Sequence, residues 1–304
     1  MALPAVPLAT ALARGPLVLD GGLSNQLAAQ GCDLSDALWS ARLLADGPAQ
    51  IEAAHAAYLR AGAQVLITAS YQATFEGFAR RGLAPQEAAA LLRRSVELAR
   101  TAAARTEREV WVAASVGPYG AMLADGSEYR GRYGLTVAEL ERFHRPRIEA
   151  LAGAGPDALA LETVPDTDEA RALLRAVRGS GLPVWLSYSV RGEHTRAGQP
   201  LREAFALAAD DDQVVAVGVN CCAPQDAAPA VELAARVTGK PVVVYPNSGE
   251  GWDDRTRRWQ GSGTFDPAMV ASWQEAGARL IGGCCRVGPD RIAALAALLK
   301  APPC

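Results

Sequence analysis

Eight short hydrophobic runs recur along the chain, and each is typical of a β-strand. Most are nearly continuous in apolar residues instead of alternating with polar ones, as expected for strands of a parallel sheet that is buried on both faces. The runs cover residues 17–22, 65–70, 110–116, 158–163, 183–190, 214–221, 241–245 and 279–285.

Segments rich in Ala, Leu and Arg separate these runs and have the spacing of amphipathic helices. Residues 51–61 carry small apolar side chains at helical spacing and are followed by Gly62, a typical stop signal. Residues 85–102 repeat the pattern. Asp266 and Pro267 together predict a helix start, because aspartate caps a helix and proline fits its first position.

The alternation of eight strands with helices predicts a (β/α)8 barrel formed by a single domain over residues 1–304. The main alternative is a doubly wound open sheet. Such a sheet usually carries a glycine-rich phosphate-binding fingerprint after an early strand, and neither GxGxxG nor GxxxxGK[ST] occurs at such a place. No charge run or low-complexity linker divides the chain.

Composition and charge narrow the class of protein. Hydrophobic residues make up 50% of the chain and charged residues 21%, which is ordinary for a soluble globular protein. The 30 basic and 33 acidic residues give a net charge of −3, which argues against a nucleic-acid partner. No apolar run reaches the ~18–20 residues needed to cross a bilayer. Residues 1–10 contain no Lys or Arg, so we expect no cleaved signal peptide.

The predicted carboxyl ends of the strands are unusually polar. In a barrel these ends carry the catalytic residues, and here they include Asp20, Glu162 and Asn220. Two connections after strands are long, at residues 119–135 and 246–265, and both contain aromatic residues and glycines. Such loops suit a role in covering a site.

Cysteines lie at two of the same strand ends. Cys221 ends the sixth predicted strand, and Cys284 and Cys285 end the eighth. Three thiolates around Zn²⁺ at ~2.3 Å would leave the fourth tetrahedral position open, as a catalytic site requires. Adjacent cysteines on an ideal strand point to opposite faces, so the chain must bend, and Gly282–Gly283 favours a bend.

Other readings of these cysteines remain open. They are also compatible with buried core thiols or with a disulfide between Cys284 and Cys285. We expect Cys222 to point away from the site, and Cys32 and Cys304 to have no role in it.

An all-sulfur ligand set implies a particular chemistry. Soft ligands select zinc over magnesium or calcium, and three thiolates donate enough charge to make the ion a poor generator of hydroxide. Such a site suits a substrate thiol, because metal binding deprotonates a thiol that is otherwise mostly protonated at pH 7. The pattern therefore predicts thiol alkylation in a reducing compartment, the cytoplasm.

Several motifs together resemble the homocysteine S-methyltransferases, from about residue 17 to about residue 297. The similar stretches are LDGGLSNQL, DALWSARLL, HAAYLRAGAQVLITASYQAT, ASVGPYGAMLADGSEYRGRYG, LALETVPD, GVNCC and GGCCR. SYQATFEGF and DGSEYRGRYG are similar to the branch that uses S-methylmethionine or S-adenosylmethionine.

The resemblance implies a (β/α)8 barrel with catalytic zinc on Cys221, Cys284 and Cys285. It also implies that Asp20 and Glu162 hold the amino-acid acceptor. Members of the family often have an acidic residue soon after the DGG motif, whereas this chain has Asn25–Gln26–Leu27 there.

Four further residues are candidates for substrate binding. The N–H groups of Gly21 and Gly22 could take a substrate carboxylate, although a plain tight turn explains these glycines equally well. Asn220 is a candidate for orienting the neighbouring ligand, or for satisfying the core. Tyr71 is a candidate aromatic face for a sulfonium cation, or an ordinary packing residue.

These observations predict a zinc-dependent enzyme that methylates the thiol of L-homocysteine to give methionine. S-Methylmethionine is the expected donor and S-adenosylmethionine the second choice. One alternative keeps the machinery and changes the acceptor to selenocysteine or another thiol or selenol. The other is a non-catalytic zinc or redox sensor. The expected partners are small molecules, with no nucleic acid and no membrane, and the sequence predicts no particular oligomeric state.

Overall fold

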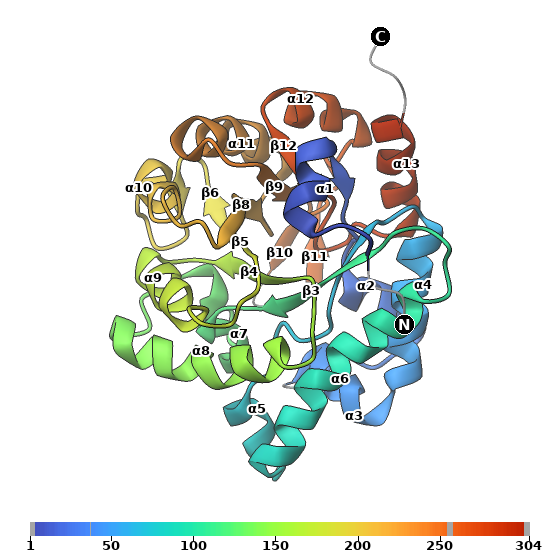
Figure 1. The fold of residues 1–304 in the computed structure, drawn as a ribbon, viewed down its shortest axis with the longest axis vertical. Coiled ribbons are helices and arrows are strands. Elements are labelled where there is room, and N and C mark those ends of the chain that lie inside the picture. The colour runs from blue at the N-terminus through green and yellow to red at the C-terminus, as the bar shows by residue number, and fades with distance from the viewer. Residues whose placement is uncertain (1–3, 37, 254–257, 301–304) are drawn as a thin grey trace.

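The eight predicted strands form one parallel barrel in a computed structural model that describes residues 4–36, 38–253 and 258–300 (Figure 1). The order of strands around the sheet is β1-β12-β9-β8-β5-β4-β3-β2, and a bridge between Leu19 and Val65 joins its two ends. The strands are β1 (Leu17–Val18), β2 (Val65–Ile67), β3 (Trp111–Val116), β4 (Ala158–Val164), β5 (Val184–Tyr188), β8 (Val214–Asn220), β9 (Val242–Tyr245) and β12 (Ala278–Ile281).

The predicted (β/α)8 barrel is therefore confirmed, and every strand except β4 is shorter than its hydrophobic run suggested. The first and last runs differ most, because β1 ends at Val18 and β12 at Ile281. After β12 the chain passes through Gly282 and Gly283 to Cys284, and after β1 Asp20 directly precedes Gly21 and Gly22, so both residues lie beyond the strand ends at the mouth of the barrel.

Helices surround the barrel on its outer side (Figure 1). The predicted segments at 51–61 and 85–102 lie in α4 and α6, and Gly62 follows α4 with a φ of 106° that favours glycine. Asp266 caps the helical turn that begins at Pro267. The α-helices are α1 (Leu8–Arg14), α2 (Leu23–Ala29), α3 (Leu43–Asp46), α4 (Pro48–Arg60), α5 (Phe75–Ala79), α6 (Pro85–Ala103), α7 (Tyr119–Leu123), α8 (Val137–Ala152), α9 (Thr167–Ala176), α10 (Leu201–Ala206), α11 (Pro224–Thr238), α12 (Val270–Glu275) and α13 (Pro289–Lys300), and the 3-10 turns are η1 (Trp39–Arg42), η2 (Ser127–Tyr129) and η3 (Pro267–Met269).

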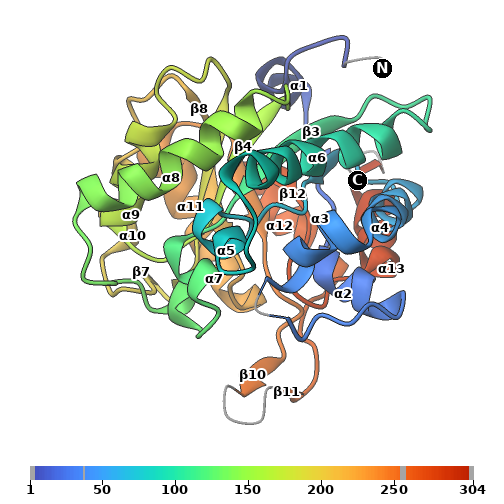
Figure 2. The same ribbon diagram turned by 90° about the horizontal axis from the view of Figure 1, so that it is seen from below.

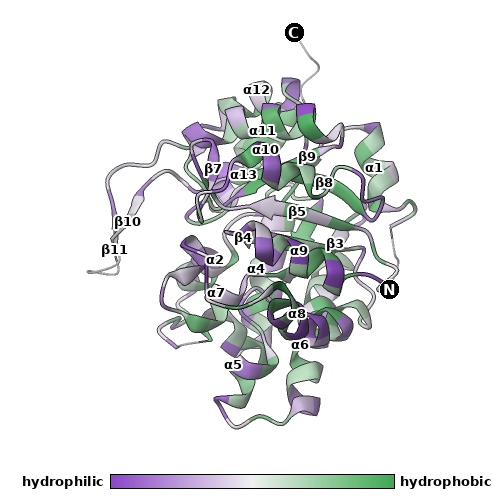
Figure 3. Ribbon diagram, turned by 90° about the vertical axis from the view of Figure 1, so that its left-hand side faces the viewer, coloured by the Kyte–Doolittle hydropathy of each residue, from purple (hydrophilic) through white to green (hydrophobic). Residues whose placement is uncertain are grey.

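Two hydrophobic clusters explain why the strands are apolar on both faces. In β4, Ala158 and Ala160 pack inside the barrel, whereas Leu159 and Leu161 pack outward under the helices. Small residues inside and large ones outside suit the narrow interior of an eight-stranded barrel. Hydrophobic colours along β3 and β8 contrast with the hydrophilic positions on α6 and α8 in Figure 3.

The two ends of the barrel differ. Helix α1 covers the amino-terminal end, where Leu8 and Leu12 join the interior cluster beside Leu17 and Trp111. The opposite end carries the turns after the strands and an antiparallel hairpin, β10 (Gly251–Asp253) and β11 (Arg258–Gln260), that projects from the body (Figure 2). Among the described residues, no helix has the length and apolar character to cross a membrane.

Candidate metal centre

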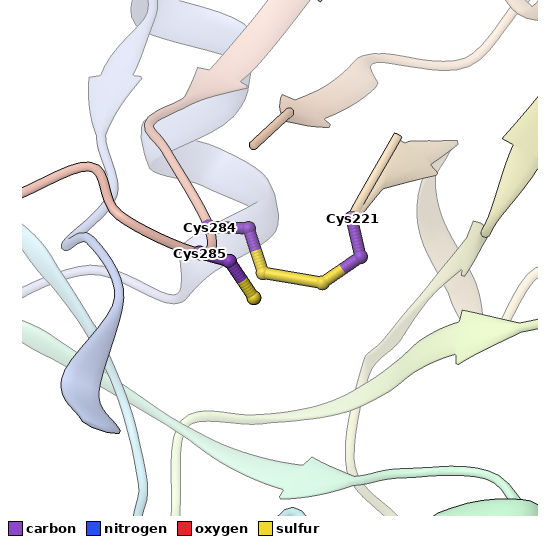
Figure 4. Close-up of side chains that lie close together, drawn as sticks. All are labelled: Cys221, Cys284 and Cys285. Carbon is purple, nitrogen blue, oxygen red and sulfur yellow. A yellow bond between two sulfur atoms is a disulfide. The ribbon is translucent and has the colours of Figure 1, made fainter. Parts of the chain in front are cut away.

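Three cysteine sulfurs converge at the mouth of the barrel. Cys221 follows β8 directly, and Cys284 and Cys285 follow β12 after a turn (Figure 4). Their Sγ atoms all lie within 4.8 Å of one another, the one such potential ligand group found in the described part of the chain. Cys222 is fully buried in the outer cluster and points away, as predicted. Cys32 lies away from the site among the partly buried residues around that outer cluster, and Cys304 lies outside the described residues.

Backbone turns bring the two adjacent cysteines to one point. A Cβ atom on Gly282 would lie 2.6 Å from the Cβ of Leu19, and one on Gly283 would lie 2.2 Å from a methyl group of Val287. Only glycine fits such spaces. Since β12 ends at Ile281 and the sulfurs of both adjacent cysteines reach the cluster, the chain departs from an extended strand here, as predicted. Cys221 itself has a φ of 47°, a left-handed turn that directs its side chain toward the other two.

A residue that sequence reasoning missed ties the two cysteine segments together. The side-chain oxygen of Asn247 accepts a hydrogen bond from the N–H of Cys285 at 3.1 Å. The N–H of Asn247 donates to the carbonyl of Cys222 at 2.9 Å. One signal in the sequence could have identified Asn247. It lies two residues after β9, and β9 is the strand between the two cysteine-bearing strands.

The structure joins Cys221 to Cys284 in a disulfide, whereas the sequence predicted three thiolate ligands and considered a Cys284–Cys285 bridge instead. The cause is the convergence of the strand ends, which places the two Cα atoms 5.6 Å apart, a usual separation for a disulfide. Cys285 keeps its thiol, and burial raises its pKa to about 11.

The donor set fits a soft divalent metal once the disulfide is reduced. Three sulfurs bound at ~2.3 Å in a tetrahedral site lie roughly 3.8 Å apart, which the observed cluster accommodates within its 4.8 Å limit. Metal binding and the disulfide exclude each other, because the ligands must be thiolates. The raised pKa of the Cys285 thiol means that an added positive charge is needed to deprotonate it at neutral pH.

Two buried carboxyl groups face the same mouth. Asp20 follows β1 and accepts a hydrogen bond from the N–H of Ile67 at 2.9 Å. Glu162, near the end of β4, accepts from the hydroxyls of Ser115 and Tyr245, the latter at 2.9 Å. Burial raises the pKa of Glu162 to about 7. Burial also raises the pKa of Asp20, and the nearby charge of Glu162 raises it further.

These carboxyl groups lack a cation. Neither forms an ion pair with a Lys, Arg or His side chain in the described part of the chain. Two neighbouring buried carboxyl groups with raised pKa values would be stabilised in their charged forms by a cation placed between them. The pair therefore suits an ammonium group.

Asn220 acts on the protein around the site. Its side-chain oxygen accepts from the N–H of Thr163 and from the hydroxyl of Ser187, and its side-chain nitrogen donates to the Thr163 hydroxyl. Thr163 has a φ of 59°, which is unusual for a β-branched residue and needs such support. Asn220 thus holds the irregular backbone at Thr163, which directly follows Glu162 in β4.

The two glycines after Asp20 serve close packing. A Cβ atom on Gly21 would lie 2.2 Å from the carbonyl oxygen of Val287, and one on Gly22 would lie 2.6 Å from that of Cys284. The N–H of Gly22 already donates to the Val287 carbonyl at 3.0 Å. The prediction that this N–H is free for a substrate carboxylate is therefore wrong for Gly22, because the cysteine loop uses it.

The run that follows these glycines also supports the cysteine loop. Asn25 accepts a hydrogen bond from the N–H of Arg286 at 2.7 Å, while Gln26 bonds to Gln30 and Leu27 is buried. An amide at position 25 thus fixes the turn just after Cys285. The departure from the family's acidic pattern leaves the cysteine cluster intact.

Two tyrosines lie on the loops after β2 and β3, and the second of them, Tyr129, reaches the cysteine cluster. The ring of Tyr71 packs so closely on Gly117 that a Cβ there would lie 2.7 Å from it. Its hydroxyl group interacts with Thr163. The hydroxyl of Tyr129 faces the Cys285 thiol and lowers the pKa of that thiol. The first of the two long connections thus reaches the site through Tyr129, and in the described part of the second, residues 246–248 and Glu250 contact the cysteine segments.

Comparison with known proteins gives a consistent result. Residues 17–299 match the family model described as homocysteine S-methyltransferase. The homocysteine S-methyltransferase of Escherichia coli is 48% identical, over 92% of this chain and 94% of its own. A selenocysteine Se-methyltransferase of Brassica oleracea is 41% identical, over 92% and 88%. The metallated form of the E. coli homocysteine methyltransferase MmuM superimposes with a TM-score of 0.84 at 46% identity, covering 93% and 96% of the two chains.

Proposed function

The chain is an enzyme of the homocysteine S-methyltransferase family, and from that premise we propose that it moves a methyl group from a sulfonium donor to the thiol of L-homocysteine. The product is methionine. S-Methylmethionine is the proposed donor and S-adenosylmethionine the second choice. The observation that carries the proposal is the convergence of three cysteine sulfurs beside two buried, unpaired carboxyl groups at one barrel mouth.

Cys221, Cys284 and Cys285 would hold the metal, which we propose to be zinc. An all-sulfur set favours zinc over harder ions, and the metallated form of the similar E. coli enzyme supports a metal at this place. When bound, the ion supplies deprotonation of the acceptor thiol while leaving its sulfur nucleophilic. The cysteines must be reduced for this, which supports a cytoplasmic location.

Asp20 and Glu162 would bind the ammonium group of homocysteine. Both are buried and both have raised pKa values, so a cation between them is favourable. The hydroxyls of Ser115 and Tyr245 fix the direction of the Glu162 carboxylate. Gly21 lies beside Asp20, and its N–H remains the candidate for the acceptor's own carboxylate.

The methyl transfer itself is an in-line displacement. The acceptor thiolate attacks the methyl carbon, a new S–C bond forms, and the donor S–C bond breaks with its electron pair passing to the donor sulfur. A thiolate and a sulfonium become two neutral thioethers. Because opposite charges disappear, exclusion of water favours the reaction, and the alignment of two bound reactants supplies much of the rate gain. Tyr71 would offer an aromatic face to the sulfonium.

A second acceptor also has support. The Brassica relative is named for selenocysteine, and a selenol would use the same metal and carboxylates. Family membership favours catalysis over the zinc or redox sensor that the cysteines alone allowed.

One assay tests the proposal. Reduced, metal-loaded protein receives L-homocysteine with S-methylmethionine or S-adenosylmethionine, and methionine is followed by mass spectrometry. The expected result is methionine that is lost after chelation and restored by zinc. Selenocysteine in a parallel reaction ranks the acceptors. Turnover that survives complete removal of metal contradicts the proposed role of the cysteines, and the absence of methionine with both donors contradicts the reaction.

A further inference from the structure

Arg196 has an unusual environment for an arginine at the edge of the site. It lies just after a short hairpin, β6 (Val190–Arg191) and β7 (His194–Thr195), that follows β5. Its Nε donates to the hydroxyl of Ser189 at 3.3 Å. Its guanidinium carbon stacks over the ring of Tyr129, 5.3 Å from the ring centre. The side chain is half-buried, and burial lowers its pKa.

Both of these contacts lead to the cysteine cluster. The hydroxyl of Ser189 donates to the carbonyl of Cys221 at 3.4 Å, and the hydroxyl of Tyr129 faces the thiol of Cys285. The guanidinium is therefore one side chain away from two of the three candidate metal ligands. It approaches them from the loops after β3 and β5.

The guanidinium has no counter-ion within ion-pair distance in the described part of the chain. Asp226 acts on it only at longer range, and the positive charge of Arg191 also acts on it. The buried Arg100, by contrast, pairs with Asp157 at 2.6 Å. An arginine has five N–H donors in a planar fork that suits a carboxylate. Among the described residues only the Nε of Arg196 has a hydrogen-bond partner, so both terminal nitrogens are available to an anion.

The carboxylate of the homocysteine acceptor is not the anion that Arg196 would bind. Its ammonium and carboxylate share one carbon atom, so both belong near Asp20 and Glu162, on β1 and β4. The contacts of Arg196 are Ser189 and Tyr129, and neither of them bonds to those carboxyl groups. A positive charge beside a sulfonium is also repulsive unless an anion lies between the two.

We propose that Arg196 binds the α-carboxylate of the methyl donor and thereby selects sulfonium donors that are amino acids. The proposal rests on the proposed function and adds a specificity-determining residue to it. The terminal guanidinium nitrogens pair with the carboxylate, which places the opposite, sulfonium end toward Tyr129 and the cysteine cluster.

The test compares two donors and three variants. The donors are S-methylmethionine and its decarboxylated analogue, (3-aminopropyl)dimethylsulfonium. Arg196→Gln should lower kcat/KM for S-methylmethionine roughly ten- to hundredfold, leave the analogue unchanged and leave the KM for homocysteine unchanged. Arg196→Lys should recover part of the loss. Arg202→Gln is the matched control, because Arg202 is exposed on α10 and its replacement removes the same charge; kcat/KM should stay unchanged for both donors.

Calorimetric binding of S-methylmethionine to each variant separates this proposal from the reaction itself. If Arg196→Gln is the one variant that binds S-methylmethionine more weakly than the wild type and Arg196→Lys, the assignment is supported. This holds even if the wild type forms no methionine, because missing methionine counts against the proposed reaction and not against donor binding by Arg196. Equal losses with both donors, a change confined to homocysteine, or unchanged donor binding overturns the role of Arg196.

Discussion

The same strands carry packing residues in the barrel interior and polar, ligand-binding candidates at the barrel mouth. On β4, Ala160 packs in the apolar interior, and Glu162, two residues later on the same face, lies at the mouth. On β9, Val243 and Tyr245 repeat this step, since Tyr245 reaches the Glu162 carboxylate. Apolar side chains fill the interior of the barrel, whereas the polar groups at its mouth bond to one another or are available to a ligand.

Because of this difference, we expect stability and activity to respond to substitutions at opposite ends of the barrel interior. The amino-terminal end is closed by α1 and by large side chains such as Trp111, so changes there remove packing. The mouth holds sulfurs and carboxyl groups that contribute little to packing. Substitutions along one segment, from Leu280 inside to Cys284 at the mouth, should therefore move from loss of stability to loss of activity.

The largest effect on activity is expected from Cys284→Ser. Serine has nearly the same shape but is a poor ligand for a soft ion, so metal binding should be lost. Methyl transfer should fall at least about a thousandfold, roughly 4 kcal/mol of transition-state stabilisation. Metal analysis and kinetics measure the two losses, with the thermal midpoint of the reduced variant as the control. A variant with full turnover and no metal contradicts the account.

Leu280→Ala tests the other end of the same segment. The side chain is fully buried inside the barrel, so its truncation leaves a cavity and should lower the free energy of unfolding by about 2–5 kcal/mol. Denaturant unfolding of the reduced protein measures this. Activity per folded molecule should stay within about threefold of the wild type. A selective loss of turnover with unchanged stability would remove the distinction between the two ends.

The smallest effect, a shift in pH dependence, is expected from Tyr245→Phe. Glu162 has a pKa near 7, so below that pH it is protonated and pairs poorly with an ammonium. In the wild type, kcat/KM for homocysteine should therefore fall as the pH drops below about 7. Tyr245 donates to the charged form and lowers this pKa, so its removal should move the acidic limb to higher pH.

The control for that shift is the plateau on the alkaline side, which should stay within about twofold of the wild type because Glu162 is charged there in both proteins. A limb that moves to lower pH, or does not move, would show that Glu162 does not set it.

Much of the fold was predictable because buried parallel strands leave a strong local signal. The eight hydrophobic runs, Gly62 after α4 and the cap at Asp266 all depend on residues close together in sequence. The cysteine cluster was predictable for a related reason: topology alone brings the ends of the sixth and eighth strands near each other.

The remaining features depend on contacts between distant segments. Nothing local marks Asn247 as a clamp on Cys285, Asn25 as a cap on Arg286, or Arg196 as a neighbour of Tyr129. The engaged N–H of Gly22 and the Cys221–Cys284 disulfide likewise result from how the turns meet. Sequence patterns indicate which strand ends carry chemistry, whereas the three-dimensional packing decides which atoms are free to use it.

If Cys221, Cys284 and Cys285 form one metal site, freshly reduced protein should contain bound metal, and its metal content is the decisive measurement. Elemental analysis of the purified chain, with thiols counted before and after chelation, should find about one zinc per chain and three cysteines that become reactive only when zinc is removed. Reduced protein that binds no stoichiometric metal, with all its accessible thiols reactive from the start, would contradict the account.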